Sequence, residues 1–249
     1  MIWLVAFIVG LLIGTAGIGG VLLIPALKLL TTLSIQAAMA TSLFTFIFTG
    51  LVGTALFQRR GSIVWSITVP LCVGGALFGF VGAVASRWID GNWLALILAV
   101  LIVAAGAYTL AGSRRVAPDH EDGAGRPQSR GLLFGIGAAT GFGSGLTGVG
   151  GPALSVPMMV VAGFPALTAV GASQVIQVLA ALSGSAAHLA HGTVDLAMAA
   201  RLTVVEVIGV AGGVRLAHAI DATMLKRGVG VLCVVVGIAL GVRTALGMG

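Results

Sequence analysis

The chain has 249 residues, of which 58% are hydrophobic and only 8% are charged, with a mean hydropathy of +1.14. Soluble domains carry about 25% charged residues, so this composition excludes a soluble domain and indicates an integral membrane protein. The net charge of +6 does not indicate nucleic-acid binding, because the basic residues mostly separate apolar segments, as signals of membrane orientation do.

The first half of the sequence predicts one interrupted apolar segment followed by three membrane spans. Residues 1–14 and 21–30 are apolar stretches on either side of a glycine-rich break, GTAGIGG. Each is about half as long as a span, since a helix rises about 1.5 Å per residue and the bilayer core needs about 20 residues. Full spans follow at residues 37–57, 63–85 and 93–111.

The composition changes abruptly at residues 113–130, which hold three of the seven acidic residues, four of the thirteen basic ones and two prolines. Such a segment cannot bury enough apolar surface to fold, so we predict a solvated cytoplasmic linker. It divides the chain into a first transmembrane repeat, residues 1–112, and a second, residues 131–249.

After the linker the pattern of the first half starts again, with residues matching at a constant offset of 131 (148 − 17 = 131). The matched pairs include Gly17 with Gly148, Gly19 with Gly150, Gly20 with Gly151, Ser42 with Ser173 and Gly61 with Gly192. Only the proline after each break departs from this offset, since Pro25 and Pro157 are 132 residues apart. The sequence therefore predicts two homologous halves.

The orientation of the halves depends on the glycine-broken segments. If these cross the membrane, each half has four crossings and the halves are parallel; if they re-enter, three crossings remain and the halves are inverted. The inverted arrangement places Arg215, Lys226 and Arg227 on the side of the linker, whereas the parallel one gains only Arg243, so the positive-inside rule favours inversion. We therefore predict an all-α polytopic membrane protein with two inverted repeats, each a re-entrant or discontinuous glycine-broken helix followed by three transmembrane helices.

Paired breaks at membrane depth are costly unless the freed backbone groups line a site. Helix N-termini carry unpaired N–H groups and a positive dipole end, and glycine lets a ligand approach the backbone, so two such ends favour an anion. The predicted binding glycines are Gly17, Gly19, Gly20, Gly148, Gly150 and Gly151. The alternative is that these glycines only allow close helix packing.

Polar residues on the span after each break extend this prediction. Ser42, Thr45 and Thr49 are spaced i, i+3 and i+7 and share one helix face. The predicted substrate-binding side chains are Ser42, Thr45, Ser173, Gln174 and Gln177, which can donate neutral hydrogen bonds to an anion. The alternative for the hydroxyls is a hydrogen bond to a carbonyl of their own helix.

Ionisable residues in the second half suggest how transport is driven. Arg201 and Glu206 lie inside the apolar residues 194–216, and intramembrane charges are functional candidates. We predict that Glu206 carries a coupling proton, that Arg201 attracts the anion, and that His188 and His191 are proton-sensitive residues of a vestibule. The alternatives are an interfacial role for the histidines and, for each of the two charged residues, a structural buried pair with another helix or a subunit contact in a homodimer.

No cofactor or metal site is predicted. Cys72 and Cys233 lie inside apolar segments and are expected to pack as small hydrophobic residues, and the two histidines lack a third ligand nearby.

The glycine–proline motifs Gly14–Pro25 and Gly141–Pro157, the Ala40–Ser42 Ala-Thr-Ser with its counterpart Ala172-Ser173, and the two-half layout resemble the TauE/SafE family of sulfite and organosulfonate exporters. Ala16 and Pro152 depart from its glycine-rich versions. The resemblance covers the chain apart from the linker. It implies a proton-coupled exporter of a small sulfur-containing or carboxylate anion in a bacterial-type inner (plasma) membrane. An intramembrane enzyme and a structural assembly protein are the alternatives.

Overall fold

The computed structural model describes residues 1–17, 19–112, 129–190 and 194–217, with residues 231, 234–235, 237–242 and 244–246 near the C-terminus. Of the predicted linker, only residues 129 and 130 are among these residues. His191 lies outside them. The described part is helical throughout, apart from short turns. Its helices are α1 (Ile2–Ala16), α2 (Gly20–Leu30), α3 (Ile35–Arg59), α4 (Trp65–Ala85), the short 3₁₀ helix η1 (Ser86–Trp88), α5 (Gly91–Gly112), α6 (Arg130–Thr147), α7 (Pro152–Val161), α8 (Ala166–Leu189) and α9 (Leu196–Ala217).

The membrane-spanning helices agree with the apolar segments of the sequence. Five helices of the described chain are long and apolar enough to cross a bilayer, namely α3, α4 extended through η1, α5, α8 and α9. The predicted spans at residues 37–57, 63–85, 93–111 and 194–216 are thereby confirmed. In contrast, α1 and α2 have 15 and 11 residues, about 22 and 16 Å, and are too short to cross a core of about 30 Å.

Each glycine break is a left-handed helix cap followed by a new helix. Gly17 has φ 74° and its N–H donates to Ile13 O at 3.1 Å, which ends α1. Gly148 ends α6 in the same way, with φ 69° and a bond to Ser144 O at 2.7 Å. Glycine adopts this conformation without the Cβ clash that other residues meet. Pro152 opens α7, where its missing N–H does no harm.

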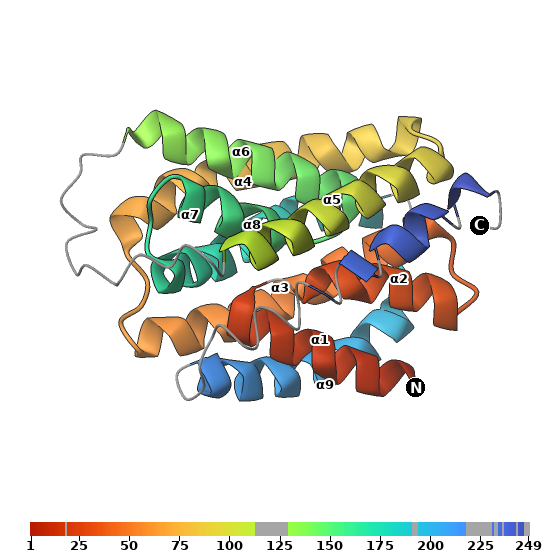
Figure 1. The fold of residues 1–249 in the computed structure, drawn as a ribbon, viewed down its shortest axis with the longest axis horizontal. Helices are drawn as coiled ribbons and strands as arrows, with labels where there is room; N and C mark the ends of the chain where they lie inside the picture. The colour runs from red at the N-terminus through yellow and green to blue at the C-terminus, as the bar shows by residue number, and fades with distance from the viewer. Residues whose placement is uncertain are drawn as a thin grey trace.

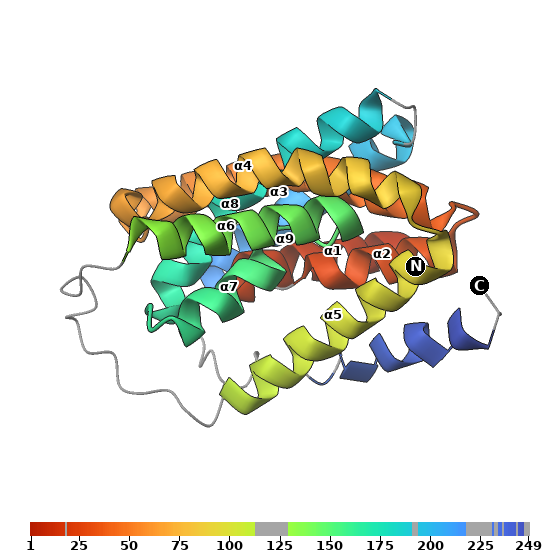
Figure 2. The ribbon, with the colours of Figure 1, turned by 90° about the horizontal axis from the view of Figure 1, so that it is seen from above.

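The helices form three layers in Figure 1, with α4 and α6 above, α3 and α8 in the middle, and α1 and α9 below. The hairpin of α1 and α2 enters from the right of this view and turns back near the centre. The hairpin of α6 and α7 enters from the left, and Figure 2 shows the same opposed directions from above. In that view α5 lies at the edge of the bundle. The breaks are therefore brought to the interior from opposite ends of the molecule.

Glycine ladders join the outer layers. On α6, a Cβ built on Gly137, Gly141 or Gly145 would collide with a carbonyl oxygen of α4, and α1 meets α9 in this way at Gly10 and Gly14. Gly10 and Gly14 correspond to Gly141 and Gly145 at the offset of 131. Small residues four apart let helix backbones approach closely in a membrane. The general glycine excess is thus largely a packing feature.

The helix bounds repeat with nearly the same spacing. From α3 to α8 and from α4 to α9 the start moves by 131 residues (166 − 35 and 196 − 65), and from α2 to α7 by 132 (152 − 20). The extra residue matches the shift already seen between the two prolines.

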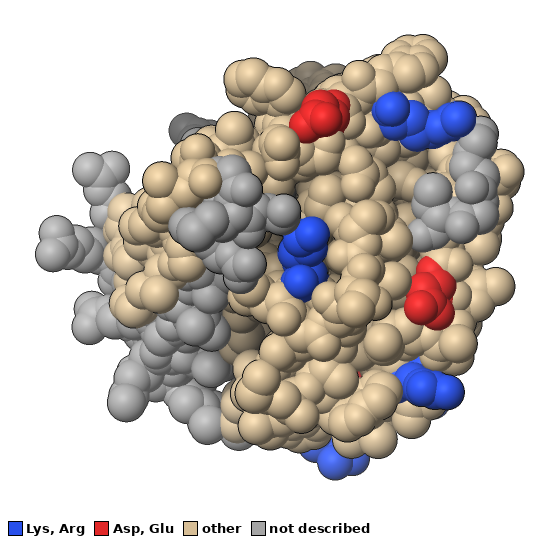
Figure 3. All heavy atoms as spheres, turned by 90° about the vertical axis from the view of Figure 1, so that its right-hand side faces the viewer, with Lys and Arg blue, Asp and Glu red and all other residues tan. Residues whose placement is uncertain are grey.

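Charged side chains are sparse in the described chain, and Glu206 is buried, whereas most of the others lie at the surface. Figure 3 shows isolated basic and acidic residues scattered over an end face that is otherwise uncharged. Large hydrophobic side chains point outward from the spans, for example Val73 and Leu77 on α4 and Val204 and Ile208 on α9. An apolar exterior of this kind suits contact with lipid.

Candidate site where the two glycine breaks meet

The two breaks touch each other in the middle of the fold. A Cβ built on Gly17 would lie 3.0 Å from Cβ of Pro152, and one built on Gly20 would lie 2.5 Å from the carbonyl oxygen of Val149. The start of α2 therefore lies against the start of α7. The breaks therefore come together, and Gly17, Gly19, Gly20 and residues 148–153 are buried.

The helices α2 and α7 both begin at this contact, and the N–H groups of their first turns have few hydrogen-bond acceptors within the helix. The first N–H groups of a helix have no acceptor within it. At α2 the capping residue is Gly19, which has no side chain to accept from these groups. At α7, Gly151 O accepts from Leu154 N at 3.1 Å and from Ser155 N at 3.0 Å, as the first turn of the helix closes. The arrangement directs the positive ends of two helices into one buried region.

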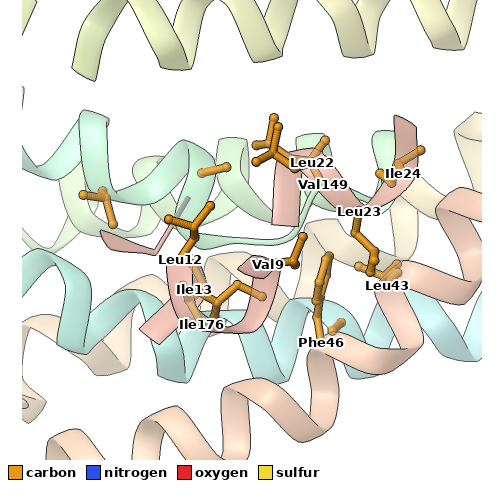
Figure 4. Close-up of a cluster of buried hydrophobic side chains, with 14 of the residues drawn as sticks. Val9, Leu12, Ile13, Leu22, Leu23, Ile24, Leu43, Phe46, Val149 and Ile176 are labelled. Atoms are coloured by element: carbon orange, nitrogen blue, oxygen red, sulfur yellow. The ribbon is translucent and has the colours of Figure 1, made fainter. Parts of the chain in front are cut away.

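Phe46 of α3 lies between the two breaks. Its ring atom Cε2 would be 3.2 Å from a Cβ built on Gly20 and 3.2 Å from one built on Gly150. The side chain is fully buried, and Figure 4 shows it projecting from α3 into the cluster that contains Val9, Leu43 and Val149. An aromatic ring thus contacts both half-helix starts.

Gln177 joins α8 to α3 beside Phe46. Its Nε2 donates to Phe46 O and to the hydroxyl of Thr49, each at 3.0 Å, and a Cβ on Gly151 would lie 3.3 Å from its Cα. Gln177 is therefore at the second break, as predicted. Its amide hydrogens are engaged by α3.

Gln174, one turn earlier on α8, extends toward the first break. Its Nε2 donates to Ile13 O at 3.4 Å, the same carbonyl that receives the cap bond of Gly17. Its Oε1 fits against Gly53, whose missing side chain leaves room for it, and has no hydrogen-bond donor among the described residues. A buried amide oxygen without a donor is costly, and it marks this end of the site as incompletely satisfied.

The predicted hydroxyls divide into two groups. Thr45, Thr49 and Ser173 donate to carbonyls of their own helices, at 2.9, 3.4 and 2.7 Å, so the alternative interpretation describes their bonds correctly. Ser173 nevertheless lies close to the first break, its Oγ 3.6 Å from a Cβ built on Gly17. Ser42 is fully buried and its Oγ has no partner in the described chain. Its hydroxyl is available to a ligand.

Glu206 of α9 is fully buried, and neither carboxyl oxygen has a hydrogen-bond partner among the described residues. The hydroxyl of Thr45 lies against the carboxyl group but donates its proton to Ser42 O. The carboxyl group therefore faces the predicted polar stripe of α3. Removing a charged carboxylate from water costs several kcal/mol unless a partner compensates for it.

The structure does not bring every predicted residue to this centre. Arg201 is exposed on the outer face of α9, three and seven residues before the exposed Val204 and Ile208, so its position on the helix turns it away from the breaks. His188 is buried in the last turn of α8 rather than open in a vestibule. Asp195 caps α9 by accepting from Met198 N at 2.9 Å.

Two residues near the breaks were missed by sequence reasoning, Phe46 and Gly53, which looked like ordinary members of an apolar helix. Thr41 was missed as well, and its hydroxyl accepts from Asp195 N at 3.1 Å where α9 begins. Phe46 could have been found, because the offset of 131 pairs it with Gln177 (46 + 131 = 177).

Comparison with known proteins agrees with this architecture. The family described as "Sulfite exporter TauE/SafE" matches residues 2–240. The chain is 28% identical to the probable membrane transporter protein YunE of Bacillus subtilis, over 97% of this chain and 96% of the relative. It is 26% identical to YdhB of the same organism (96% and 99% covered) and 27% identical to MJ0441 of Methanocaldococcus jannaschii (76% and 72%), both also described as probable membrane transporter proteins.

No solved structure matches the chain. The five apolar helices and the matched family identify an integral protein of the plasma membrane. Since the family match covers nearly the whole sequence, the chain belongs to the sulfite exporter TauE/SafE family of membrane transporters.

Proposed function

We propose that the protein is a secondary transporter that exports a small anion, such as sulfite, an organosulfonate or a carboxylate, and binds it where the two glycine breaks meet. The observation that carries this proposal is the direct contact between the starts of α2 and α7 inside the bundle. Two helix N-termini converging on one buried point provide N–H donors and positive dipole ends for an anion.

Side chains around the breaks supply the neutral part of the site. Ser42 has an unused hydroxyl, and Gln174 brings to the first break a primary amide with one hydrogen bond in the described chain, whereas Gln177 uses its amide hydrogens to hold α3 at the second break. Neutral donors suit an anion that must be released again, because a buried arginine would hold it as an ion pair. Arg201, turned outward, is left out of this site.

The proposed transport cycle is alternating access by two inverted repeats. Support comes from the helix starts that recur after 131 residues and from the two hairpins that enter from opposite ends in Figure 1. In this arrangement each hairpin closes one side of the central site, and movement of one bundle against the other exposes the site to each side in turn.

Glu206 is proposed to carry the coupling proton. The Thr45 hydroxyl has one hydrogen, which it donates to Ser42 O, so it can accept a bond from a protonated Glu206, whereas donating to the carboxylate would require it to rotate and give up the bond to Ser42 O. A change in this proton would therefore change the contact between α9 and α3 beside the site. His188 is buried in the last turn of α8, and its sensitivity to protons stays a prediction.

The proposal is tested by reconstituting the purified full chain in proteoliposomes and measuring uptake of labelled sulfite, taurine, sulfoacetate and acetate. We expect saturable flux of at least one of these anions, inhibited by an excess of the unlabelled anion. The same anion should raise the thermal unfolding midpoint in detergent, because a ligand that binds only the folded state stabilises it. Liposomes that show no flux above protein-free controls for any of the four would contradict the proposal.

A further inference from the structure

We infer that Phe46 sets the size limit of the anion that the central site accepts. This inference rests on the proposed function, because it assigns the specificity of the same site. The ring is not a distant member of the core, since its Cε2 is 3.2 Å from the Cβ positions of both Gly20 and Gly150. A molecule bound between the two breaks must share that volume with the ring.

The position of the ring is fixed by its neighbours. Gln177 holds the backbone of Phe46 by donating from Nε2 to its carbonyl oxygen at 3.0 Å. The same Nε2 also donates to the hydroxyl of Thr49 at 3.0 Å. The absence of side chains at Gly20 and Gly150 lets both half-helix starts close on the ring. The ring therefore lies at a fixed place beside the backbone donors.

The two halves contribute different side chains to this centre at positions related by the offset of 131. Phe46 and Gln177 occupy corresponding positions of the two halves and contact each other, so the fold places an aromatic ring on one side and a primary amide on the other. The corresponding residues one turn earlier are Leu43 and Gln174, which repeat the contrast. The backbone N–H groups and the second amide hydrogen of Gln174 can hold an oxyanion head, whereas Phe46 limits the space left for its carbon chain.

The test compares straight-chain sulfonates of increasing length, from methanesulfonate to butanesulfonate, in transport competition and in ligand-dependent thermal stabilisation. We expect Phe46→Ala to raise the preference for butanesulfonate over methanesulfonate by about tenfold or more relative to the unchanged protein. Burying one methylene is worth about a factor of four, and the two sulfonates differ by three methylenes. Phe46→Val should give an intermediate shift, and it serves as the folded variant if the alanine variant is unstable.

Phe44→Ala is the matched control. Phe44 lies on the same helix, but its ring packs against Phe48 at 5.7 Å between centroids and contacts neither break. This variant should keep the length preference of the unchanged protein. The size limit would be overturned if Phe46→Ala and Phe46→Val showed the same preference for butanesulfonate over methanesulfonate as Phe44→Ala.

The two readouts separate this inference from the proposed function. If the unchanged protein moves no anion but the thermal stabilisation by butanesulfonate grows selectively in Phe46→Ala, the site and its size limit stand and export is wrong. If anions are transported but the Phe46 variants keep the length preference of the unchanged protein, export stands and the size limit is wrong.

Discussion

At the scale of single residues, the centre of this protein combines backbone donors, neutral side chains and one buried acid. Glu206 is the fully buried acidic residue of the described chain, whereas Asp90 is exposed and Asp195 caps a helix. A carboxyl group without hydrogen-bond partners would be an expensive structural element. Its burial next to Thr45 is easier to understand if a change in its proton is part of the transport cycle.

Replacing Glu206 by glutamine tests this role with almost no change in shape. Accumulation of anion driven by an imposed pH gradient should fall to background, because the amide cannot take up or release a proton. Downhill flux driven by the anion gradient alone should remain. Both are measured in proteoliposomes with and without the pH gradient. Gradient-driven accumulation equal to that of the unchanged protein would show that Glu206 does not carry the proton.

Asp195→Asn is the control for the loss of an acid from the same helix. Asparagine caps helices about as well as aspartate, so the bond to Met198 N and the stability of α9 should be kept. This variant should therefore respond to the pH gradient as the unchanged protein does.

At the scale of helices, the breaks differ in how tightly they are packed, and this difference is testable. Alanine at Gly17 or Gly148 must adopt a left-handed conformation, which costs about 1–2 kcal/mol. At Gly148 the added Cβ would also meet the backbone of Met39, 2.8 Å from its Cα, which cannot rotate away. At Gly17 the nearest atoms belong to the side chains of Pro152 and Val156.

We therefore expect Gly148→Ala to lower the thermal unfolding midpoint more than Gly17→Ala, and both to reduce flux. Gly135→Ala on the exposed face of α6 is the matched control, because its Cβ would meet nothing within 4 Å. Alanine is better than glycine in a helix by about 1 kcal/mol, so this variant should be as stable as the unchanged protein or more so. A Gly148→Ala protein as stable as Gly135→Ala would contradict the strained cap.

Much of this element-level architecture could be predicted, because apolar length and glycine punctuation are strong signals in a membrane protein. The spans, the caps at Gly17 and Gly148, and the start of α7 at Pro152 follow from them. The side-chain centre could not be predicted as well. Nothing in the hydropathy distinguishes Phe46 from the other apolar residues of α3, and nothing in it shows that Arg201 turns outward.

At the scale of the whole molecule, the direction of the second hairpin decides between the two arrangements of the repeats. In Figure 1 the turn after α2 and the turn after α7 lie at opposite ends of the bundle. If the halves are inverted, these turns face opposite sides of the membrane. If they were parallel, both turns would face the same side.

Single cysteines at Thr32 and Leu167, both exposed, report on these two turns, in a protein whose Cys72 and Cys233 are replaced by alanine. We expect a membrane-impermeant thiol reagent to label one of them in right-side-out vesicles and the other in inside-out vesicles. A cysteine at the exposed Arg60, in the turn after α3, serves as the reference and should label with Leu167, because α3 ends where α8 begins. Labelling of Thr32 and Leu167 from the same side would exclude the inverted arrangement. Alternating access around a shared centre would then need another geometry, because two hairpins from one side cannot close the site in turn.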